Sequence, residues 1–457
     1  GSGRSHPQAR QSLRGVEDDG RPDFEVRTIG RQGKKLLIIG LDGVSYEMLA
    51  GGDNQPSLLP RMKKFFAGSV ARMSASIPEI SAVSWSSFMT GTQAGEHGIY
   101  GFVDLVPGSY QYRFPDFRDL KVEPFFCELG ARHLRSVIIN LPATYPARPI
   151  PGVLVSGFVA LDLEKAVYPA RYLPMLTQAG YQIDVDAGKG KDRKAEFLAD
   201  LHCALKVRRQ VAGMLWEKEE WDVFMFTVTG TDRLQHFLYD AYADAGHEFH
   251  GEFASFFDEV DQAAADFLER AAAMDNVEIV ALSDHGFGPI RSEVYLNQVL
   301  RKNGFFASEN SGAKGLPGIS GRATAFALDP SRLYVHTKGK YPKGAVAAGD
   351  YEKVRTDLTQ LFAGYEVKGR KAVRRAYLKE ELYQGGQISH APDIVLLSEP
   401  GIDLKGGMEK DQESGNSHFT GMHRQDNAFL ACGRTGVVAA RPTIFDVKGL
   451  LYRLLAT

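Results

Sequence analysis

Acidic and imidazole side chains, together with one serine hydroxyl, are spread along the sequence, mostly where apolar segments end. They are Asp42, Ser81, Asp232, His236, Asp284, His285 and His423. Carboxylates and imidazoles are common ligands of divalent cations, and three of each are enough for two cations. A serine oxygen beside a bound cation can serve as an activated nucleophile. The set therefore indicates phosphoryl transfer assisted by two metal ions.

Two pairs in this set have informative spacing. Asp232 and His236 stand four residues apart in TDRLQH, so a helix that begins there would present both on one face. Asp284 and His285 are adjacent in LSDHGFGP. Neighbouring side chains usually point apart, so a shared metal requires a local kink, which Gly286 would permit; otherwise the two residues serve different ions. The simpler interpretations are a solvated helix face for the first pair and a polar turn for the second.

The remaining candidates lie in turns or at the start of a helix. Asp42 directly follows the apolar run KKLLIIGL. It is followed by a glycine, and an Asp-Gly pair is also typical of a plain turn. Ser81 lies in IPEISAVSWSSFMTG, where a helix is expected to begin, and free N–H groups there would favour an alkoxide and a bound phosphate. The simpler interpretation is that Ser81 or Ser84 only caps this helix. His423 in GMHRQDNAF would otherwise be an exposed loop histidine.

Short apolar runs that end near these residues predict buried parallel strands. They are Lys34–Leu41, Ser136–Leu141, Asp222–Val228 and Val277–Ser283. Helical patterns lie between them at Asp192–Lys218 and Phe253–Met274. This alternation predicts a doubly wound, mostly parallel α/β sheet that binds ligands beyond the carboxyl ends of its strands.

The pattern changes between about residues 300 and 395, which predicts an inserted subdomain or lid. This stretch contains a Gly- and Ser-rich loop, an amphipathic helix and short strands, at Ser308–Arg322, Tyr351–Phe362, Leu333–His336 and Ile394–Leu397. A last helix is expected at Ile444–Leu455. The predicted division is an N-terminal arm at 1–33, a catalytic core at 34–300 and 390–457, and an insertion at 301–389.

The bulk composition is that of an ordinary globular protein. The chain has 457 residues, an apolar fraction of 44% and a formal net charge of −2, so nothing predicts a nucleic-acid-binding face. No apolar run reaches membrane-spanning length. The three cysteines are far apart and odd in number, which predicts core residues rather than disulfides. The sequence determines neither the oligomeric state nor the location, which is cytoplasmic or, if a signal peptide once preceded Gly1, periplasmic or extracellular.

The motifs occur in an order that resembles the alkaline phosphatase superfamily, in particular the type I phosphodiesterase/nucleotide pyrophosphatase group with its bacterial phosphohydrolase members. In sequence they are LDG, SxxxWSSFMTG with EHGIYGF, TDRLQHF, SDHGFGP and GMHR. The resemblance covers most of 34–300 and 390–457 and implies an alkaline-phosphatase-like core. It also implies two zinc ions, with Ser81 as nucleophile and as a hydroxyl ligand of the second ion. The implied ligands are Asp232, His236 and His423 for one ion, and Asp42, Asp284 and His285 for the other. Manganese would also suit these oxygen donors.

The sequence departs from the family pattern at positions that concern the substrate. Many relatives have Thr in place of Ser81, and the nucleotide pyrophosphatases have a phosphate-binding Asn in place of Ser84, which makes Ser84 the candidate substrate contact. The residues after Ser81 do not match the sulfatase pattern. No arginine can be assigned to the role that grips phosphate monoesters, which favours diesters.

These features predict a phosphodiesterase or nucleotide pyrophosphatase that acts on a small-molecule phosphoester through a phosphoseryl intermediate on Ser81. The alternatives on the same site are a phosphonate hydrolase, a phosphomonoesterase or a phosphoryl-group transferase. A further alternative is an inactive, metal-stabilised binding protein. Aromatic segments around Tyr110–Phe117 and Phe125-Phe126, or the insertion, are the candidates for the walls of a leaving-group pocket.

Overall fold

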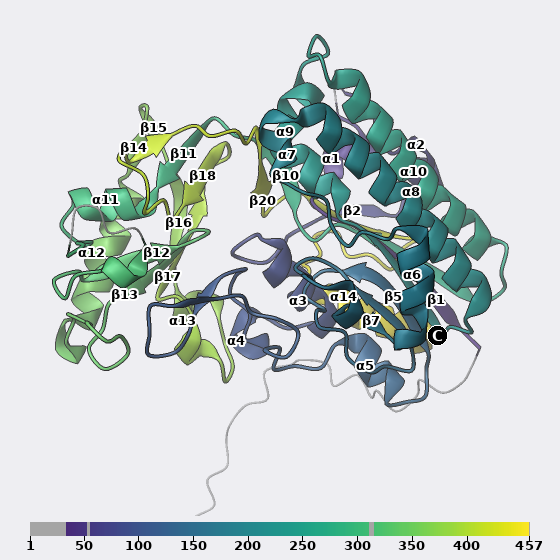
Figure 1. The fold of residues 1–457 in the computed structure, drawn as a ribbon, viewed down its shortest axis with the longest axis horizontal. Helices are drawn as coiled ribbons and strands as arrows, with labels where there is room; N and C mark the ends of the chain where they lie inside the picture. The colour runs from purple at the N-terminus through teal and green to yellow at the C-terminus, as the bar shows by residue number, and fades with distance from the viewer. Residues whose placement is uncertain (1–32, 53–54, 310–314, 457) are drawn as a thin grey trace, which may run out of the picture.

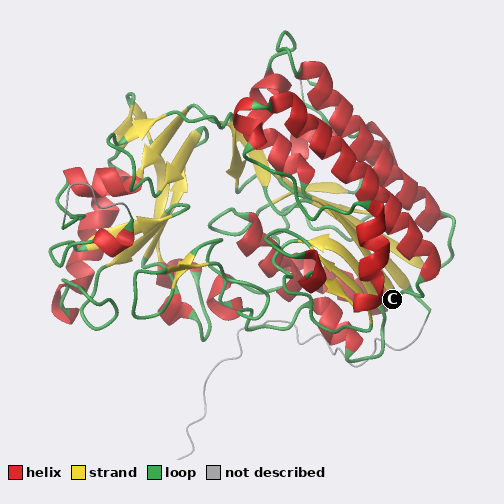
Figure 2. Ribbon diagram, viewed as in Figure 1, coloured by secondary structure: helices red, strands yellow, loops and turns green. Residues whose placement is uncertain are grey.

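The computed structural model describes residues 33–52, 55–309 and 315–456. All of the predicted N-terminal arm except residue 33 lies outside these ranges, as do residues 310–314 of the predicted Gly- and Ser-rich loop. Figure 1 shows a larger lobe built on a central sheet and a smaller lobe beside it. Helices lie on both faces of the central sheet, whereas strands make up much of the smaller lobe (Figure 2).

The central sheet has the strand order β2-β21-β9-β1-β8-β5-β6-β7. Strands β9, β1, β8, β5 and β6 run parallel to one another. Strand β21 pairs antiparallel with β9, β2 pairs antiparallel with β21, and β7 pairs antiparallel with β6, so β21 and β7 run against the parallel strands. The predicted mixed α/β class with a mostly parallel sheet is therefore confirmed. The bounds are Lys35–Leu41 (β1), Val70–Met73 (β2), Ser136–Leu141 (β5), Gly152–Ser156 (β6), Val167–Tyr168 (β7), Val223–Val228 (β8), Val277–Leu282 (β9) and Ala428–Cys432 (β21).

The central strand β1 shows why helices cover both faces. Its apolar residues are fully buried, and alternate residues enter different cores. Leu37 and Ile39 pack in the core that includes residues of α8 (Lys194–Lys218) and α10 (His250–Ala272). Leu36 and Ile38 pack in the core formed with α3 (Ser81–Thr90) and α14 (Asp446–Ala456). A continuous apolar run suits a parallel strand with no solvent-exposed face.

A second sheet, with the order β12-β13-β17-β16, forms the centre of the smaller lobe. Its strands are Ala325–Leu328 (β12), Arg332–Val335 (β13), Val373–Leu378 (β16) and Ile394–Ser398 (β17). Helices α11 (Leu296–Lys302) and α12 (Tyr351–Ala363) lie in the same lobe (Figure 1). The division at residues 301 and 389 stays a prediction, and β17, which follows residue 389, is paired within this second sheet.

Arg332 ties the smaller lobe to the loop that follows α4 (Ala94–His97) in the larger one. Its side chain is fully buried, and Nη2 donates to the carbonyl of Val103 over 2.7 Å. Gly101 allows this approach, because a Cβ at that position would lie 2.5 Å from the guanidinium carbon. The same loop carries Phe102, which lines the cavity described below.

No helix in the described part of the chain is both long enough and apolar enough to cross a membrane.

Replacing Arg332 with methionine should destabilise the contact between the lobes. The Val103 carbonyl loses its charged donor, and an orphaned acceptor of this kind costs about 1–3 kcal/mol. Urea unfolding should show this loss for Arg332→Met and almost none for Arg370→Met, because Arg370 is exposed. Equal free energies of unfolding for the two variants would show that the contact between Arg332 and Val103 does not stabilise the protein.

Candidate active site and metal centre

Three neighbouring strands of the central sheet bring acidic and imidazole side chains to one edge. Asp42 directly follows β1, and Asp284 follows β9 on one side of it. On the other side, β8 leads into α9 (Gly230–Ala243), which carries Asp232 and His236 in its first turns. Carboxyl ends of parallel strands meet at the same edge, which is where open α/β sheets bind ligands.

His423 reaches this edge from a separate two-stranded ribbon. It lies on β20 (Gly421–Arg424), which pairs with β10 (Gly286–Pro289) so that His423 stands opposite Phe287. Because β10 starts directly after His285, the pairing brings His423 beside residues that are far from it in the sequence.

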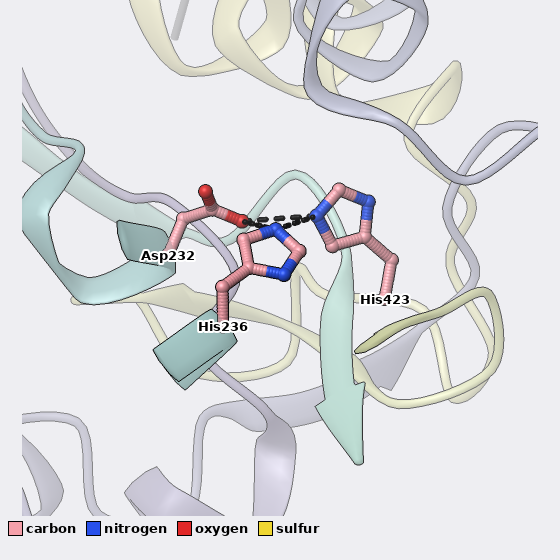
Figure 3. Close-up of side chains that lie close together, drawn as sticks. All are labelled: Asp232, His236 and His423. Atoms are coloured by element: carbon pink, nitrogen blue, oxygen red, sulfur yellow. Dashed lines mark hydrogen bonds and ion pairs between the residues drawn. The ribbon is translucent and has the colours of Figure 1, made fainter. Parts of the chain in front are cut away.

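Asp232, His236 and His423 converge on one point (Figure 3). His423 Nε2 lies 3.0 Å from Asp232 Oδ1, and His236 Nε2 lies 3.4 Å from the same oxygen. The two Nε2 atoms are 3.0 Å apart. The predicted helix therefore does present Asp232 and His236 on one face.

A second group meets the first at Asp232. His285 Nε2 lies 3.6 Å from Asp42 Oδ1, 3.3 Å from Asp284 Oδ2 and 4.0 Å from Asp232 Oδ1. Asp284 and His285 occupy the bend between β9 and β10, so the kink expected from their adjacency is present. Gly286 lets Asn427 pack against this bend, since a Cβ there would lie 1.8 Å from Asn427 Oδ1.

Asp284 is held by the backbone on one side only. Gly43, at a φ of +69°, donates its N–H to Asp284 Oδ1 over 3.1 Å. The other oxygen, Oδ2, is buried and has no hydrogen-bond partner within the described residues. A buried carboxylate oxygen without a donor is costly, and a bound cation would satisfy it.

The histidine rings present their Nε2 atoms to these carboxylates. Each Nδ1 lies near a backbone carbonyl: that of Gly421 for His236, Gly286 for His285 and Glu79 for His423, at 3.2, 3.0 and 2.9 Å. A carbonyl only accepts, so Nδ1 carries the proton and a neutral ring has its lone pair on Nε2. This arrangement is typical of metal-binding histidines, and a cation would relieve the close approach of the His236 and His423 lone pairs.

Burial and mutual repulsion shift the pKa values of these groups. Burial, then repulsion from Asp284 and Asp232, raises the pKa of Asp42 well above its usual value. Burial likewise raises the pKa of Asp284 to about 8 and lowers that of His285 to about 4. Burial would also raise the pKa of Asp232, but His236 and His423 outweigh it and hold that pKa well below its usual value. When ionised, Asp42 and Asp284 would therefore lack compensating charge in this buried place, and divalent cations would supply that charge.

Ser81 faces this cluster rather than capping its helix. It is the first residue of α3, whose N-cap is Ile80, and no side chain caps the helix. The Ser81 hydroxyl donates to Asp42 Oδ1 over 3.2 Å, and Oγ lies 3.1 Å from His285 Nε2. One turn later, Trp85 Nε1 donates to Asp42 Oδ2 over 3.1 Å. Sequence reasoning missed Trp85, although its spacing of four from Ser81 was a usable signal.

Ser84, the candidate substrate contact, lies elsewhere. Its side chain is fully buried, and its Oγ is 2.7 Å from that of Ser76. The expectation that Ser84 contacts substrate is therefore not supported, because its hydroxyl is buried beside Ser76 and Ser84 does not line the cavity over the cluster.

A cavity lies over the cluster, with about 300 Å³ of empty space when the part open to solvent is included. Its lining residues are Asp42, Ser81, Phe102, Phe158, Thr229, Asp232, Arg233, His236 and His423. An arginine that sequence reasoning could not assign is thus present as Arg233, directly after Asp232. Phe102 and Phe158 also line a second cavity, together with Pro115 and Asp116 of the predicted aromatic segment. By contrast, Phe125 and Phe126 are buried in the core.

Replacing Trp85 with phenylalanine should weaken metal binding without unfolding the protein. Asp42 loses the donor that orients it, and loss of such a partner usually lowers metal affinity about 10- to 100-fold. Competition with a chromophoric chelator would measure zinc affinity. Trp216→Phe is a matched control, because Trp216 packs in the opposite core. Unchanged affinity in Trp85→Phe would show that the indole does not position Asp42.

Solved structures with a similar fold include a phosphonoacetate hydrolase and two ectonucleotide pyrophosphatase/phosphodiesterases. Phosphonoacetate hydrolase from Sinorhizobium meliloti 1021, in complex with phosphonoacetate, is 15% identical with a TM-score of 0.58, and the match covers 93% of this chain and 96% of that one. Murine ectonucleotide pyrophosphatase/phosphodiesterase 5 is 12% identical with a TM-score of 0.53, covering 92% and 95%. The human form is 12% identical with a TM-score of 0.55 and the same coverage. At these identities the likeness concerns the fold.

At the level of sequence, no curated protein matches this chain. A family model described as type I phosphodiesterase/nucleotide pyrophosphatase matches residues 36–426. The match spans all seven candidate residues, from Asp42 to His423. The chain therefore belongs to the type I phosphodiesterase/nucleotide pyrophosphatase family of the alkaline phosphatase superfamily and is a phosphoester hydrolase.

Proposed function

We propose that this enzyme is a phosphodiesterase or nucleotide pyrophosphatase that forms a phosphoseryl intermediate on Ser81. The observation that carries the proposal is the position of the Ser81 hydroxyl, 3.2 Å from Asp42 Oδ1 and 3.1 Å from His285 Nε2, at the wall of a cavity. A capping serine would direct its oxygen to backbone N–H groups instead.

Two zinc ions fit the donor set. Asp232, His236 and His423 would hold one ion, and Asp42, Asp284 and His285 would hold the other beside Ser81. The buried Asp284 Oδ2 without a donor and the facing Nε2 atoms support this assignment. Imidazole and carboxylate donors suit zinc, and manganese would also accept the oxygen donors. When bound, the cations would lower the pKa of the serine hydroxyl and neutralise charge on the phosphoryl group.

Side chains and backbone groups of the protein then position the reacting groups for two successive displacements at phosphorus. A new bond forms between Ser81 Oγ and phosphorus while the bond from phosphorus to the leaving group breaks on the opposite side. The hydroxyl proton points at Asp42 Oδ1, which Trp85 holds in place. This proton leaves Oγ as the bond to phosphorus forms, and the leaving group takes up a proton as it departs. Water then cleaves the phosphoserine ester and restores the Ser81 hydroxyl, so two displacements give net retention at phosphorus. The N-terminus of α3 offers free N–H groups to the phosphoryl oxygens.

A phosphonate hydrolase is the second candidate. Arg233 lines the cavity and weakens the earlier preference for diesters, which rested on the lack of an assignable arginine. The fold is also shared with a phosphonoacetate hydrolase.

Replacing Ser81 with alanine should lower kcat at least about 1,000-fold, because the nucleophile is lost. Metal content, measured by mass spectrometry, should stay at two ions per chain. Ser84→Ala serves as the control and should retain near-normal turnover, since Ser84 is buried and bonded to Ser76. Near-normal rates in Ser81→Ala would refute the nucleophile assignment.

Chelation should abolish turnover, and added zinc should restore it. The assay compares bis-p-nitrophenyl phosphate, p-nitrophenyl phosphate and p-nitrophenyl sulfate, with and without chelator. We expect the diester to be cleaved fastest and the sulfate slowest. Faster cleavage of the monoester would favour a phosphomonoesterase, and full metal content without activity on any ester would favour a binding protein.

A further inference from the structure

Arg233 is fixed at the cavity wall by an acidic and an aromatic side chain. Its Nε and Nη2 atoms donate to Asp184 Oδ2 over 3.1 and 2.7 Å. Its guanidinium carbon lies 4.1 Å from the centre of the Phe158 ring. The side chain is only 16% exposed, so the planar group has little freedom to move. Such a fork is preorganised for a bidentate oxyanion.

The edge of this guanidinium that carries Nη1 remains available to a ligand. Among the described residues, the one recorded partner of Nη1 is Asp232 Oδ2 at 3.5 Å, which is long for a hydrogen bond. Asp184 is bound through Nε and Nη2, so it does not use this edge. Arg233 thus brings a cation with unused N–H capacity to a cavity otherwise bordered by Asp42 and Asp232.

The position of Arg233 relative to Ser81 suggests which part of a substrate it meets. Ser81 contacts Asp42 and His285, whereas Arg233 follows Asp232 and borders the other ligand group. An in-line displacement puts the nucleophile and the leaving group on opposite sides of phosphorus. The leaving group therefore faces the Asp232 end of the cavity, where Arg233 lies.

We propose that Arg233 is a specificity residue that binds a second anionic group, a phosphate or a carboxylate, on the leaving group of the substrate. This inference rests on the proposed function, because it takes Ser81 as the nucleophile. It narrows the substrate class to phosphoesters or phosphonates whose leaving group carries a phosphate or a carboxylate. An alternative role, in which Arg233 only neutralises Asp232, would affect every substrate alike.

The test compares the zinc-loaded full chain with its Arg233→Gln and Arg233→Lys variants on three substrates. The p-nitrophenyl ester of thymidine 5′-monophosphate has a leaving group without a second anion. Thymidine 5′-triphosphate has a phosphate-bearing leaving group, and phosphonoacetate has a carboxylate-bearing one. For whichever anionic substrate the unmodified enzyme cleaves, Arg233→Gln should lower kcat/KM about 10- to 100-fold more than for the p-nitrophenyl ester. The loss should lie mainly in KM, and Arg233→Lys should recover part of it.

A matched control separates the loss of anion binding by Arg233 from structural damage to the segment around Asp184. Arg208 is a buried arginine whose Nη2 donates to the Ile183 carbonyl, beside Asp184, and it does not line the active-site cavity. Arg208→Gln should therefore change all three rates by a similar factor. A selective loss in Arg208→Gln equal to that in Arg233→Gln would overturn the proposal.

Binding gives a readout that does not depend on turnover. This experiment uses the zinc-loaded Ser81→Ala variant and measures binding by calorimetry. Adding Arg233→Gln should lower the affinity for inorganic pyrophosphate about tenfold more than the affinity for inorganic phosphate, with metal content unchanged. Equal losses for both anions, loss of bound metal, or equal kinetic losses on all substrates would overturn the proposal. So would an enzyme that cleaves only the p-nitrophenyl ester, although that result would leave the proposed function intact. If the unmodified enzyme cleaves none of the three substrates, the proposed function itself fails.

Discussion

Mutual repulsion among buried carboxylates is the constraint on which this site depends. Asp42, Asp232 and Asp284 lie together with little access to solvent, and burial and repulsion raise the pKa values of Asp42 and Asp284. His285 in its neutral form cannot compensate for the charge of Asp42 and Asp284, because its Nε2 lone pair faces both carboxylates. Taking such groups out of water costs several kcal/mol for each ion unless a counter-charge accompanies them. Divalent cations bound to the same atoms would supply that charge.

The rest of the larger lobe holds these groups in place before any cation arrives. Strands β1, β8 and β9 are buried on both faces and end at one edge, so their continuations cannot separate. The β10–β20 ribbon adds His423 from a distant part of the chain. Trp85 and the Gly43 N–H then orient Asp42 and Asp284 individually. Because the cluster is preorganised, ligand binding requires less free energy for reorganisation.

Much of this arrangement follows from local sequence patterns. The apolar run before Asp42 predicted a buried parallel strand, and the observed strand is Lys35–Leu41. The spacing of Asp232 and His236 predicted a shared helical face, since that relation depends only on helix geometry. The antiparallel outer strands β2 and β21 were not predicted, because their pairing depends on contacts between distant segments.

The parts of the site that local patterns did not reveal depend on side-chain direction. Ser84 has the right position relative to the family motif but points at Ser76, and only the packing around α3 decides this. Arg233 directly follows a ligand candidate in sequence, yet its contacts with Asp184 and Phe158 join segments about 50 and 75 residues away. The adjacency of Asp284 and His285 required a kink that the family resemblance implied and that the β9–β10 bend provides.

The most direct test is a crystal structure of the zinc-loaded enzyme with anomalous diffraction recorded on both sides of the zinc absorption edge. The account predicts two anomalous peaks, one bound by Asp232, His236 and His423, and one bound by Asp42, Asp284 and His285 with Ser81 Oγ as a further neighbour. A single peak, or a second ion bound away from Ser81, would contradict it.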